Sequence, residues 1–365
     1  MTRNHKPLGF GWIGQGQNHR QNRHRCSIYC VVPPHMLEKV AVNGNEEQQD
    51  WAFRTLNLSA EFRGRRRAVG SINFAVSPGE KRRTIFDAAT TQTLPGKLVR
   101  GEGDPPSTDE AVNEAYDSAG STYDFFSEIY ERNSIDDKGL RLDSTVHYGV
   151  KYDNAFWNGD QMVYGDGDGE LFQRFTICID VIAHELTHGV TQYEASLNYS
   201  GESGALNESM SDVFGSLVKQ WVKKQTADQA DWIIGEGLFT EKVKGVGIRS
   251  MKEPGTAYDD PVLGKDPQPA HYKDIYVGMK DNGGVHINSG IPNRAFYLTA
   301  TAIGGNAWEK AGKIWYVALR DRLRPKSNFK DAASLLVKVA GELYGEASTE
   351  QLAVQQAWQQ VGVEI

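Results

Sequence analysis

The residues whose types and spacing most clearly indicate chemistry are His184, Glu185 and His188. Two histidines four residues apart lie on one face of a helix, so both imidazoles can reach a single metal ion. The intervening Glu185 lies within reach of a metal-bound water and can take its proton. The pattern predicts a hydrolytic zinc site, and the alternative is an exposed helix that carries these residues by chance.

A second group of candidate ligands follows twenty residues later, at Glu208 and Asp212. Because a catalytic zinc takes three protein ligands and keeps one position open, Glu208 is expected to complete a His-His-Glu set around one Zn²⁺. Asp212 lies one helical turn further on the same face. We expect it to accept the free N–H of a zinc-bound histidine.

The elements that must hold these residues are mainly helical in the second half of the chain. Apolar spacing predicts a long helix over 107–130, with a capping box at Ser107 and Glu110, and a last helix that starts at Ser348. Alternating apolar residues predict a strand over 145–156. The fold class is therefore expected to be α+β, with a β-rich first half, a long helix between the halves and a helical second half.

Three further segments extend the metal pattern, namely Asn154–Gly159, Met162–Gly169 and Asp281–Gly290. Together with the two ligand motifs, and in the same order, they resemble the motifs of the thermolysin-like neutral metalloproteases. The resemblance runs from about Thr84 to the C-terminus. It implies a two-lobed enzyme, with a β-rich lobe at 84–190 that carries the zinc helix and a helical lobe at 191–365.

The resemblance also implies a role for each matching residue. Zinc would be bound by His184, His188 and Glu208, with Glu185 as the general base. The oxyanion would receive hydrogen bonds from His286 and Tyr199, with His286 oriented by Asp281. The substrate main chain would be held by Asn154, Ala155 and Arg249. An apolar pocket for the residue after the scissile bond would be lined by Phe172, Phe175, Val181 and Ile248. These roles predict a zinc endopeptidase that cuts proteins or peptides on the amino side of bulky apolar residues.

Two other function classes remain open. One is a peptide-binding or regulatory protein that keeps the scaffold without catalysis, and the intact Glu185 and His286 argue against it. The other is a zinc amidase that acts on non-peptide bonds. Asn154, Ala155 and Arg249 favour a peptide backbone over that substrate.

The sequence departs from the resembled family at a paired calcium site. Asp180, Asp231 and Glu236 match the expected carboxylates, but Lys219 and Ile233 stand where acidic ligands are expected. An ammonium group in a calcium site replaces the cation with a fixed charge. We therefore predict that calcium is absent from this site and that Lys219 bridges the remaining carboxylates.

The front of the chain resembles the protealysin-like branch of the family, in which a short propeptide carries a cysteine followed by Pro-Pro. Residues 1–25 are polar and expected to be disordered, and residues 26–83 form the pro-segment with its linker. A thiolate is a strong zinc ligand, so we hypothesise that Cys30, or else Cys26, blocks the zinc of a zymogen. The alternative is an inert thiol. Self-processing is expected between about residues 60 and 83.

The charge of the chain is divided unevenly. Residues 1–83 carry 14 Lys and Arg against 6 Asp and Glu, a net charge of +8, and the remainder carries 26 against 41, a net charge of −15. We expect the basic front to dock on the acidic body as an intramolecular inhibitor. The basic run 63–67 lacks the interleaved aromatic residues of a nucleic-acid site, so no nucleic-acid partner is expected.

Composition sets the remaining bounds. With 39% hydrophobic and 24% charged residues the chain is typical of globular proteins, and no stretch approaches the ~20 apolar residues of a membrane span. A monomer without membrane contact is expected. No signal peptide is visible, so secretion is implied by the resemblance alone, and the alternative is a cytoplasmic enzyme with non-classical export.

Overall fold

The computed structural model describes residues 29–64 and 80–365. The pro-segment contributes the strand β1 (Tyr29–Cys30) and the helices α1 (Pro34–Asn43) and α2 (Glu46–Gly64). The body continues with β2 (Arg83–Asp87), β3 (Lys97–Arg100), α3 (Glu110–Tyr130), β4 (Leu142–Val146), β5 (Ala155–Trp157), β6 (Met162–Tyr164), α4 (Ile179–Tyr193) and α5 (Gly201–Lys223). It ends with the short strands β7 (Ile233–Ile234), β8 (Arg249–Ser250), β9 (Asp259–Asp260) and β10 (Gly264–Lys265), followed by α6 (Asp281–Asn288), α7 (Gly290–Ile303), α8 (Ala311–Val317), α9 (Phe329–Tyr344) and α10 (Thr349–Gln360).

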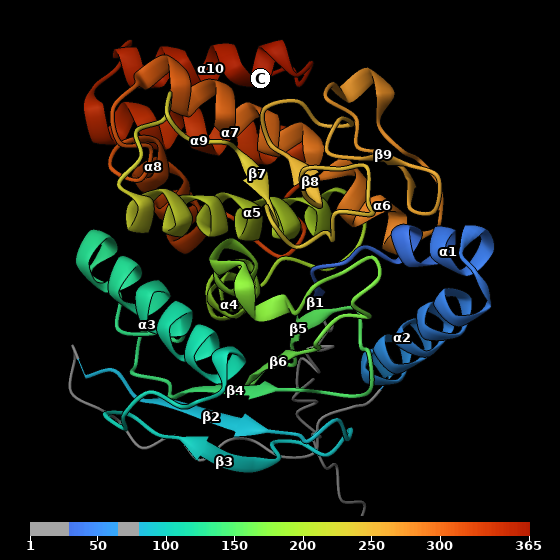
Figure 1. Cartoon of the computed structure of the whole chain (residues 1–365). Coiled ribbons are helices and arrows are strands. Elements are labelled where there is room, and N and C mark those ends of the chain that lie inside the picture. The colour runs from blue at the N-terminus through green and yellow to red at the C-terminus, as the bar shows by residue number, and fades with distance from the viewer. Residues whose placement is uncertain (1–28, 65–79) are drawn as a thin grey trace, which may run out of the picture.

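One six-stranded sheet organises the first half of the body. Its strand order is β1-β5-β6-β4-β2-β3, so β1, the first strand in the described part of the chain, occupies an edge beside β5. The pairs of β4 with β2 and with β6 are parallel, and the other pairs are antiparallel. Figure 1 shows the sheet in the lower part of the molecule, α4 at the centre, the C-terminal helices above it, and α1 and α2 at one side. The mixed α+β architecture agrees with the expectation.

A continuous apolar core joins the two halves. The helices α3, α5 and α8 meet in an aromatic cluster in which Tyr130 stacks on Tyr316, with ring centroids 4.4 Å apart, and contacts Phe214 edge-on at 5.9 Å. Each of these large rings removes a large apolar area from water, so the aromatic side chains contribute strongly to the stability of the core. The helix α4, which carries the two histidines, is fixed in place because its buried apolar residues belong to the same core as those of α3 and α5.

The boundaries of three predicted elements can be compared directly. The long helix begins at Glu110 rather than Ser107, because the side chain of Asp109 caps it by accepting a hydrogen bond from the Ala111 N–H. The predicted strand over 145–156 is interrupted, since His147 adopts a positive φ of 54° after β4. Ser348 caps the last helix as predicted, by accepting a hydrogen bond from the Gln351 N–H.

The lobe boundaries at 84–190 and 191–365 stay a prediction, because α4 runs on to Tyr193 and its core is shared. Residues 1–25, predicted to be disordered, lie outside the described part of the chain, as does most of the predicted processing region. Among the described helices, none has both the length and the apolar character that crossing a bilayer requires.

Candidate metal centre and active site

Two adjacent helices position the candidate metal ligands. His184 and His188 project from α4, and Glu208 projects from α5. The two helices approach closely at Gly215, where a Cβ atom would lie 2.6 Å from the Asp180 carbonyl oxygen. A side chain at Gly215 would push the helices apart and separate the ligands.

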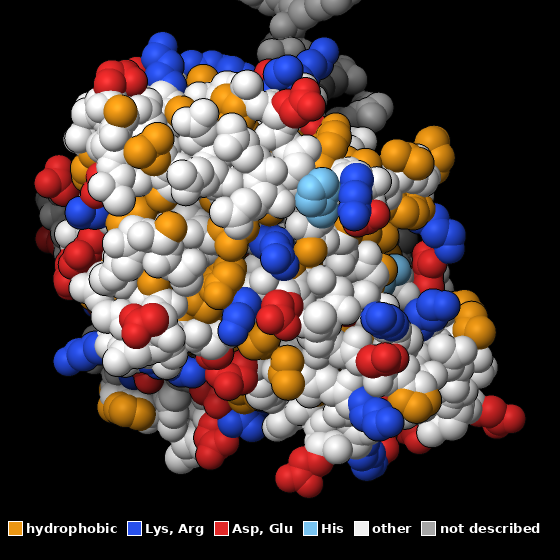
Figure 2. All heavy atoms as spheres, turned by 90° about the horizontal axis from the view of Figure 1, so that it is seen from above, with side chains coloured by type: hydrophobic (Ala, Val, Ile, Leu, Met, Phe, Trp, Pro, Cys, Tyr) orange, Lys and Arg blue, Asp and Glu red, His pale blue; other side chains and the backbone are white. Residues whose placement is uncertain are grey.

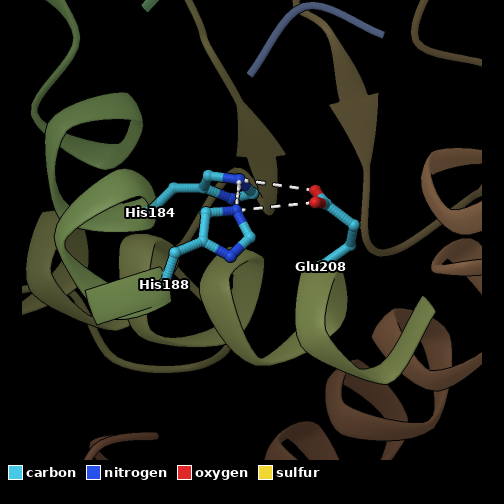
Figure 3. Close-up of side chains that lie close together, drawn as sticks. All are labelled: His184, His188 and Glu208. Carbon is cyan, nitrogen blue, oxygen red and sulfur yellow. Dashed lines mark hydrogen bonds and ion pairs between the residues drawn. The ribbon is translucent and has the colours of Figure 1, made fainter. Parts of the chain in front are cut away.

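The three side chains converge on one point (Figure 3). The Nε2 atoms of His184 and His188 lie 3.1 Å apart, and the Glu208 carboxylate oxygens lie 3.5 Å from each of them. All three residues are fully buried. Two imidazole nitrogens and one carboxylate are the donor set of a catalytic zinc, so the residues present fit that ion.

Hydrogen bonds behind the ligands fix the histidine tautomers. His184 Nδ1 lies 2.8 Å from Asp212 Oδ1, and His188 Nδ1 lies 2.8 Å from Asn207 Oδ1. With protons held on Nδ1, both Nε2 atoms are free to bind a metal. Asp212 therefore lies where it was predicted, and Asn207 is a second supporting residue, which was not predicted. Its position directly before Glu208 was the available signal.

A buried ion pair supports Asp212 in turn. Arg249 Nε donates to Asp212 Oδ2 and Arg249 Nη2 donates to Oδ1, both at 2.8 Å, and Asn293 Nδ2 donates to Oδ2 at 2.8 Å. Burial alone would raise the pKa of Asp212, but Arg249 and His184 lower it to about 2. The carboxylate is therefore ionised at any working pH. Asn293 was not predicted, because only the tertiary packing of α7 brings it here.

A second cluster faces the ligands from α6. His286 Nδ1 lies 2.6 Å from Asp281 Oδ1, and the His286 backbone N–H donates to Asp281 Oδ2 at 2.8 Å. Asp281 can fold back onto His286 because positive φ angles, including 79° at Gly284, turn the start of α6. A Cβ at Gly284 would also lie 2.5 Å from the Tyr276 ring.

Tyr199 connects this cluster to the metal ligands. Its hydroxyl donates to Glu208 Oε1 and lies 3.2 Å from His286 Nε2. Burial opposes protonation of His286, but Asp281 and Glu208 raise its pKa to about 8. The structure thus brings together His286, Tyr199 and Asp281 beside the candidate zinc ligands, as the resemblance implied.

Glu185 lies on the same helix turn as the two histidines. Its Oε2 accepts a hydrogen bond from the Trp157 N–H at 3.0 Å, and its Oε1 accepts none from the described residues. Burial raises the pKa of Glu185 to about 8. A carboxylate with one oxygen fixed and one free, whose proton affinity is raised by burial, is suited to proton transfer near neutral pH.

The predicted substrate-binding residues hold the pro-segment main chain. β1 pairs antiparallel with β5, and the Val31 N–H donates to the Ala155 carbonyl at 3.2 Å. The Val32 N–H donates to Asn154 Oδ1 at 2.9 Å. Arg249 Nη1 donates to the Val31 carbonyl at 3.1 Å.

The four residues predicted to line an apolar pocket are buried and belong to one apolar cluster that also contains Val31. They are Phe172, Phe175, Val181 and Ile248. The Phe172 and Phe175 rings are stacked at 5.9 Å. A valine side chain of the pro-segment is therefore buried in the same main apolar core as the four predicted pocket residues.

The hypothesis that a thiol blocks the zinc stays a prediction for Cys30. Its carbonyl oxygen lies 3.0 Å from His286 Nε2, whereas its side chain packs in an apolar cluster with Tyr148, Tyr152 and Phe156. Among the described residues, the ligand atoms that gather at the metal position come from His184, His188 and Glu208, without the Cys30 thiol. Strand pairing causes this difference, because it fixes which way the side chain points. Cys26 lies outside the described residues.

The described ion pairs between residues 26–83 and the body run in both directions. Lys81 pairs with Asp124 at 2.6 Å and Arg83 pairs with Glu102, whereas Glu47 pairs with Lys151 at 2.6 Å and Glu38 with Lys280 at 2.8 Å. The basic run 65–67 lies outside the described part. On the face of the molecule in Figure 2, basic and acidic side chains are interspersed.

Lys219 lies in the position predicted for it. Its Nζ is 3.0 Å from Asp180 Oδ2 and 2.8 Å from Asp231 Oδ1, and it donates to the Ile233 carbonyl at 2.5 Å. The ammonium group is almost fully buried. Burial opposes ionisation of Lys219, but the two carboxylates raise its pKa above the ordinary value.

We therefore expect added calcium to leave the melting temperature unchanged, because an ammonium group already neutralises the carboxylates. Lys219→Ala should lower the free energy of unfolding by about 3 kcal/mol, since it leaves buried carboxylates without their cation. Lys242→Ala is the matched control, because Lys242 and its partner Glu170 are exposed and their contact contributes little. Thermal melting with and without calcium measures both effects, and a calcium-dependent rise for the wild type would contradict the prediction.

Comparisons with known proteins agree with this geometry. The family model described as the catalytic domain of thermolysin metallopeptidase matches residues 73–192, and that of the alpha-helical domain matches residues 195–363. The chain is 51% identical over 339 residues to an extracellular metalloprotease of Pectobacterium carotovorum, covering 93% of this chain and 97% of that protein. It is 44% identical over 288 residues to a thermolysin of Alicyclobacillus acidocaldarius, a match that covers 76% of this chain and 50% of that protein.

A solved structure resembles most of the chain. The precursor of protealysin, a metalloproteinase from Serratia proteamaculans, superimposes with a TM-score of 0.86 at 55% identity, covering 92% of this chain and 100% of that one. That likeness includes a precursor form, which fits the pro-segment described above. With a matching family model over each lobe and a His-His-Glu site at their junction, the chain belongs to the thermolysin metallopeptidase family and is a metalloendopeptidase.

Proposed function

We propose that the enzyme hydrolyses peptide bonds on the amino side of bulky apolar residues and is made as a zymogen. The observation that carries the proposal is an extended peptide beside the His-His-Glu cluster, because the pro-segment main chain binds Asn154, Ala155 and Arg249. The position bounded by these three residues and the His-His-Glu cluster is called the cleft below. Burial of the Val31 side chain in the main apolar core, to which Phe172, Phe175, Val181 and Ile248 also belong, supports the preference for an apolar residue after the scissile bond.

A zinc ion bound by His184, His188 and Glu208 would supply acidification of a water molecule and polarisation of the scissile carbonyl. Glu185 takes the proton of the attacking water and delivers it to the leaving nitrogen. His286 and Tyr199 donate hydrogen bonds where negative charge develops on the carbonyl oxygen, and Asp281 keeps His286 oriented and charged. Arg249 and Asn154 hold the peptide in register with these groups.

The pro-segment supports latency by binding both sides of the cleft. From α1, Asn43 Nδ2 donates to the Val262 carbonyl at 3.3 Å in the second half of the chain. From α2, the Ser59 and Tyr152 hydroxyls lie 3.0 Å apart in the first half. A segment that bridges the cleft while its own strand fills it excludes other peptides.

The site of action follows from resemblance. A relative with 51% identity is named an extracellular metalloprotease, which supports a secreted enzyme. We further propose that the mature enzyme is a monomer whose site needs no residue from a second chain, because zinc ligands, general base and oxyanion donors all come from one chain.

Hydrolysis assays on the processed enzyme test this function. Casein and furylacryloyl peptides with an apolar residue after the scissile bond should be cut, and a zinc chelator should stop the reaction. A scaffold without catalysis would bind these peptides without cutting them. A zinc amidase would leave them intact while cutting non-peptide amides.

Latency should weaken at acid pH because of His35 in α1. Its Nε2 lies 3.3 Å from the Tyr258 hydroxyl, and its buried Nδ1 has no hydrogen-bond partner among the described residues. The pKa of His35 is lowered to about 4, mainly by burial. The nearby Asp281 carboxylate acts in the opposite direction, whereas the positive charges of His286 and Arg249 lower the pKa further. The docked pro-segment thus binds fewer protons than the released one. Its docking is strongest above the ordinary pKa of 6.5 and weakens as pH falls towards 4.

We expect the activity of the precursor, relative to the processed enzyme at the same pH, to rise on the order of ten-fold between pH 7 and pH 5. His35→Phe should remove most of this dependence, because it leaves no group to protonate. His271→Gln, a histidine in the loop before α6, is the control and should behave as wild type. An unchanged ratio across this range would contradict the prediction.

A further inference from the structure

The pro-segment does more than fill the cleft, because it presents one particular peptide bond to the catalytic residues. The Cys30 carbonyl oxygen lies 3.0 Å from His286 Nε2, the donor assigned to the oxyanion. On the other side of that bond, the Val31 N–H donates to the Ala155 carbonyl at 3.2 Å and the Val31 carbonyl accepts from Arg249 at 3.1 Å. Three backbone groups around the Cys30–Val31 bond therefore contact residues assigned to the oxyanion or to the substrate main chain.

The side chains on the two sides of this bond occupy different apolar clusters. Cys30 packs with Tyr148, Tyr152 and Phe156, and Val31 belongs to the main core cluster. Cys30 is 3% exposed and Val31 is 0% exposed. Antiparallel pairing with β5 alternates the side chains in this way, so a small residue precedes the bond and a β-branched apolar residue follows it.

We propose that the Cys30–Val31 peptide bond is a self-cleavage site of the zinc-loaded precursor, in addition to any cut in the linker. The proposal rests on the proposed function, because it uses the same catalytic residues. The cut is intramolecular, since the bond is buried in its own cleft and no second enzyme molecule can reach it.

The reaction balances as an ordinary hydrolysis. A water oxygen adds to the Cys30 carbonyl carbon while Glu185 takes the water proton. The bond between that carbon and the Val31 nitrogen breaks, and Glu185 passes the proton to the nitrogen. The products are a Cys30 carboxylate and a Val31 amine, and no group is oxidised or reduced.

The cut chain is expected to stay in place. The part that starts at Val31 is still anchored by the contacts of Asn43 with Val262 and of Ser59 with Tyr152. It therefore continues to occupy the cleft from Val31 onward, and latency outlasts the cut.

To test the proposal, wild-type precursor is loaded with zinc and incubated. It is then denatured to release any fragments, which are analysed by mass spectrometry. We expect a fragment that begins at Val31, and Glu185→Gln precursor should yield none even when processed wild-type enzyme is added in trans. If the Cys30–Val31 bond stays intact while the processed enzyme from the same preparation hydrolyses casein, the self-cleavage proposal fails and the proposed function stands. If casein is not hydrolysed either, the proposed function fails as well.

A matched pair of variants places the same charge inside and outside the cleft. Val31→Asp puts a carboxylate into the apolar cluster and should reduce the cut at this bond by at least ten-fold. Val42→Asp puts it on the exposed face of α1, where Val42 is 74% exposed, and should leave the cut unchanged. Equal cleavage in both variants would contradict the assigned position of Val31.

The position of Val31 can also be tested without catalysis, which matters if the pro-segment of Val31→Asp does not dock. In the Glu185→Gln precursor, hydrogen exchange at the Val31 and Val32 amides should be slowed, because both donate to the cleft. Exchange at the rate of an exposed strand would overturn the register, and with it the proposal.

Discussion

Replacing Glu185 with glutamine should lower kcat for peptide hydrolysis by about 10³-fold while zinc stays bound. The amide keeps the shape of the side chain and can still accept the hydrogen bond from the Trp157 N–H. It cannot accept a proton, so the water is no longer activated and the leaving nitrogen receives no proton. Steady-state kinetics on the processed enzyme, with zinc content measured by atomic absorption, gives both quantities.

The fold should not suffer from this change. Glu185 is fully buried, and burial already raises its pKa, so a neutral amide is at least as well accommodated. The melting temperature of Glu185→Gln should therefore equal or exceed that of the wild type. Glu241→Gln in an exposed loop controls for the loss of a carboxylate elsewhere. A variant that keeps zinc and most of its kcat would exclude Glu185 as the general base.

Replacing Arg249 with methionine should be the most damaging change outside the metal ligands. The guanidinium makes two hydrogen bonds to Asp212 and a third to the peptide carbonyl at Val31. Removing it takes the guanidinium from the buried Asp212 carboxylate, which keeps only His184 and Asn293 as partners, at a cost of about 3–5 kcal/mol in the free energy of unfolding. Chemical denaturation should measure that loss, and kcat/KM should fall because the substrate main chain loses a donor.

A double variant separates the two effects of Arg249. In Arg249→Met with Asp212→Asn no unpaired charge remains, so stability should recover in part, whereas kcat/KM should stay low. Arg322→Met is the control, since Arg322 and its partner Glu342 are exposed and little change is expected. If Arg249→Met were as stable as wild type, the buried ion pair would not support the site as described.

The zinc ligands were predictable from the sequence because helical periodicity alone places them. His184 and His188 share one face by their spacing, and the same argument places Glu208 and Asp212 one turn apart. Asn293 was not predictable in this way, because it reaches Asp212 only through the packing of α7 against α5. Long-range partners of this kind depend on tertiary structure, which no local pattern encodes.

The Cys30 hypothesis stays a prediction for a related reason. The resemblance to the protealysin-like branch drew attention to a cysteine before Pro-Pro, and the affinity of thiolates for zinc suggested a role for it. Which atom of Cys30 faces the catalytic residues depends on its pairing with Phe156, 126 residues away. Strand register alternates the side chains, so the carbonyl faces His286 and the thiol does not join the ligands.

The placement of β1 beside β5 has a consequence for the order of synthesis. Tyr29 and Cys30 leave the ribosome long before Phe156, and Phe156 leaves before Glu208 and His286 complete the catalytic set. Because domains fold largely in the order of translation, the sheet edge can be occupied before an active site exists. The producing cell would thus never contain an unguarded nascent protease, since the inhibitor is translated first.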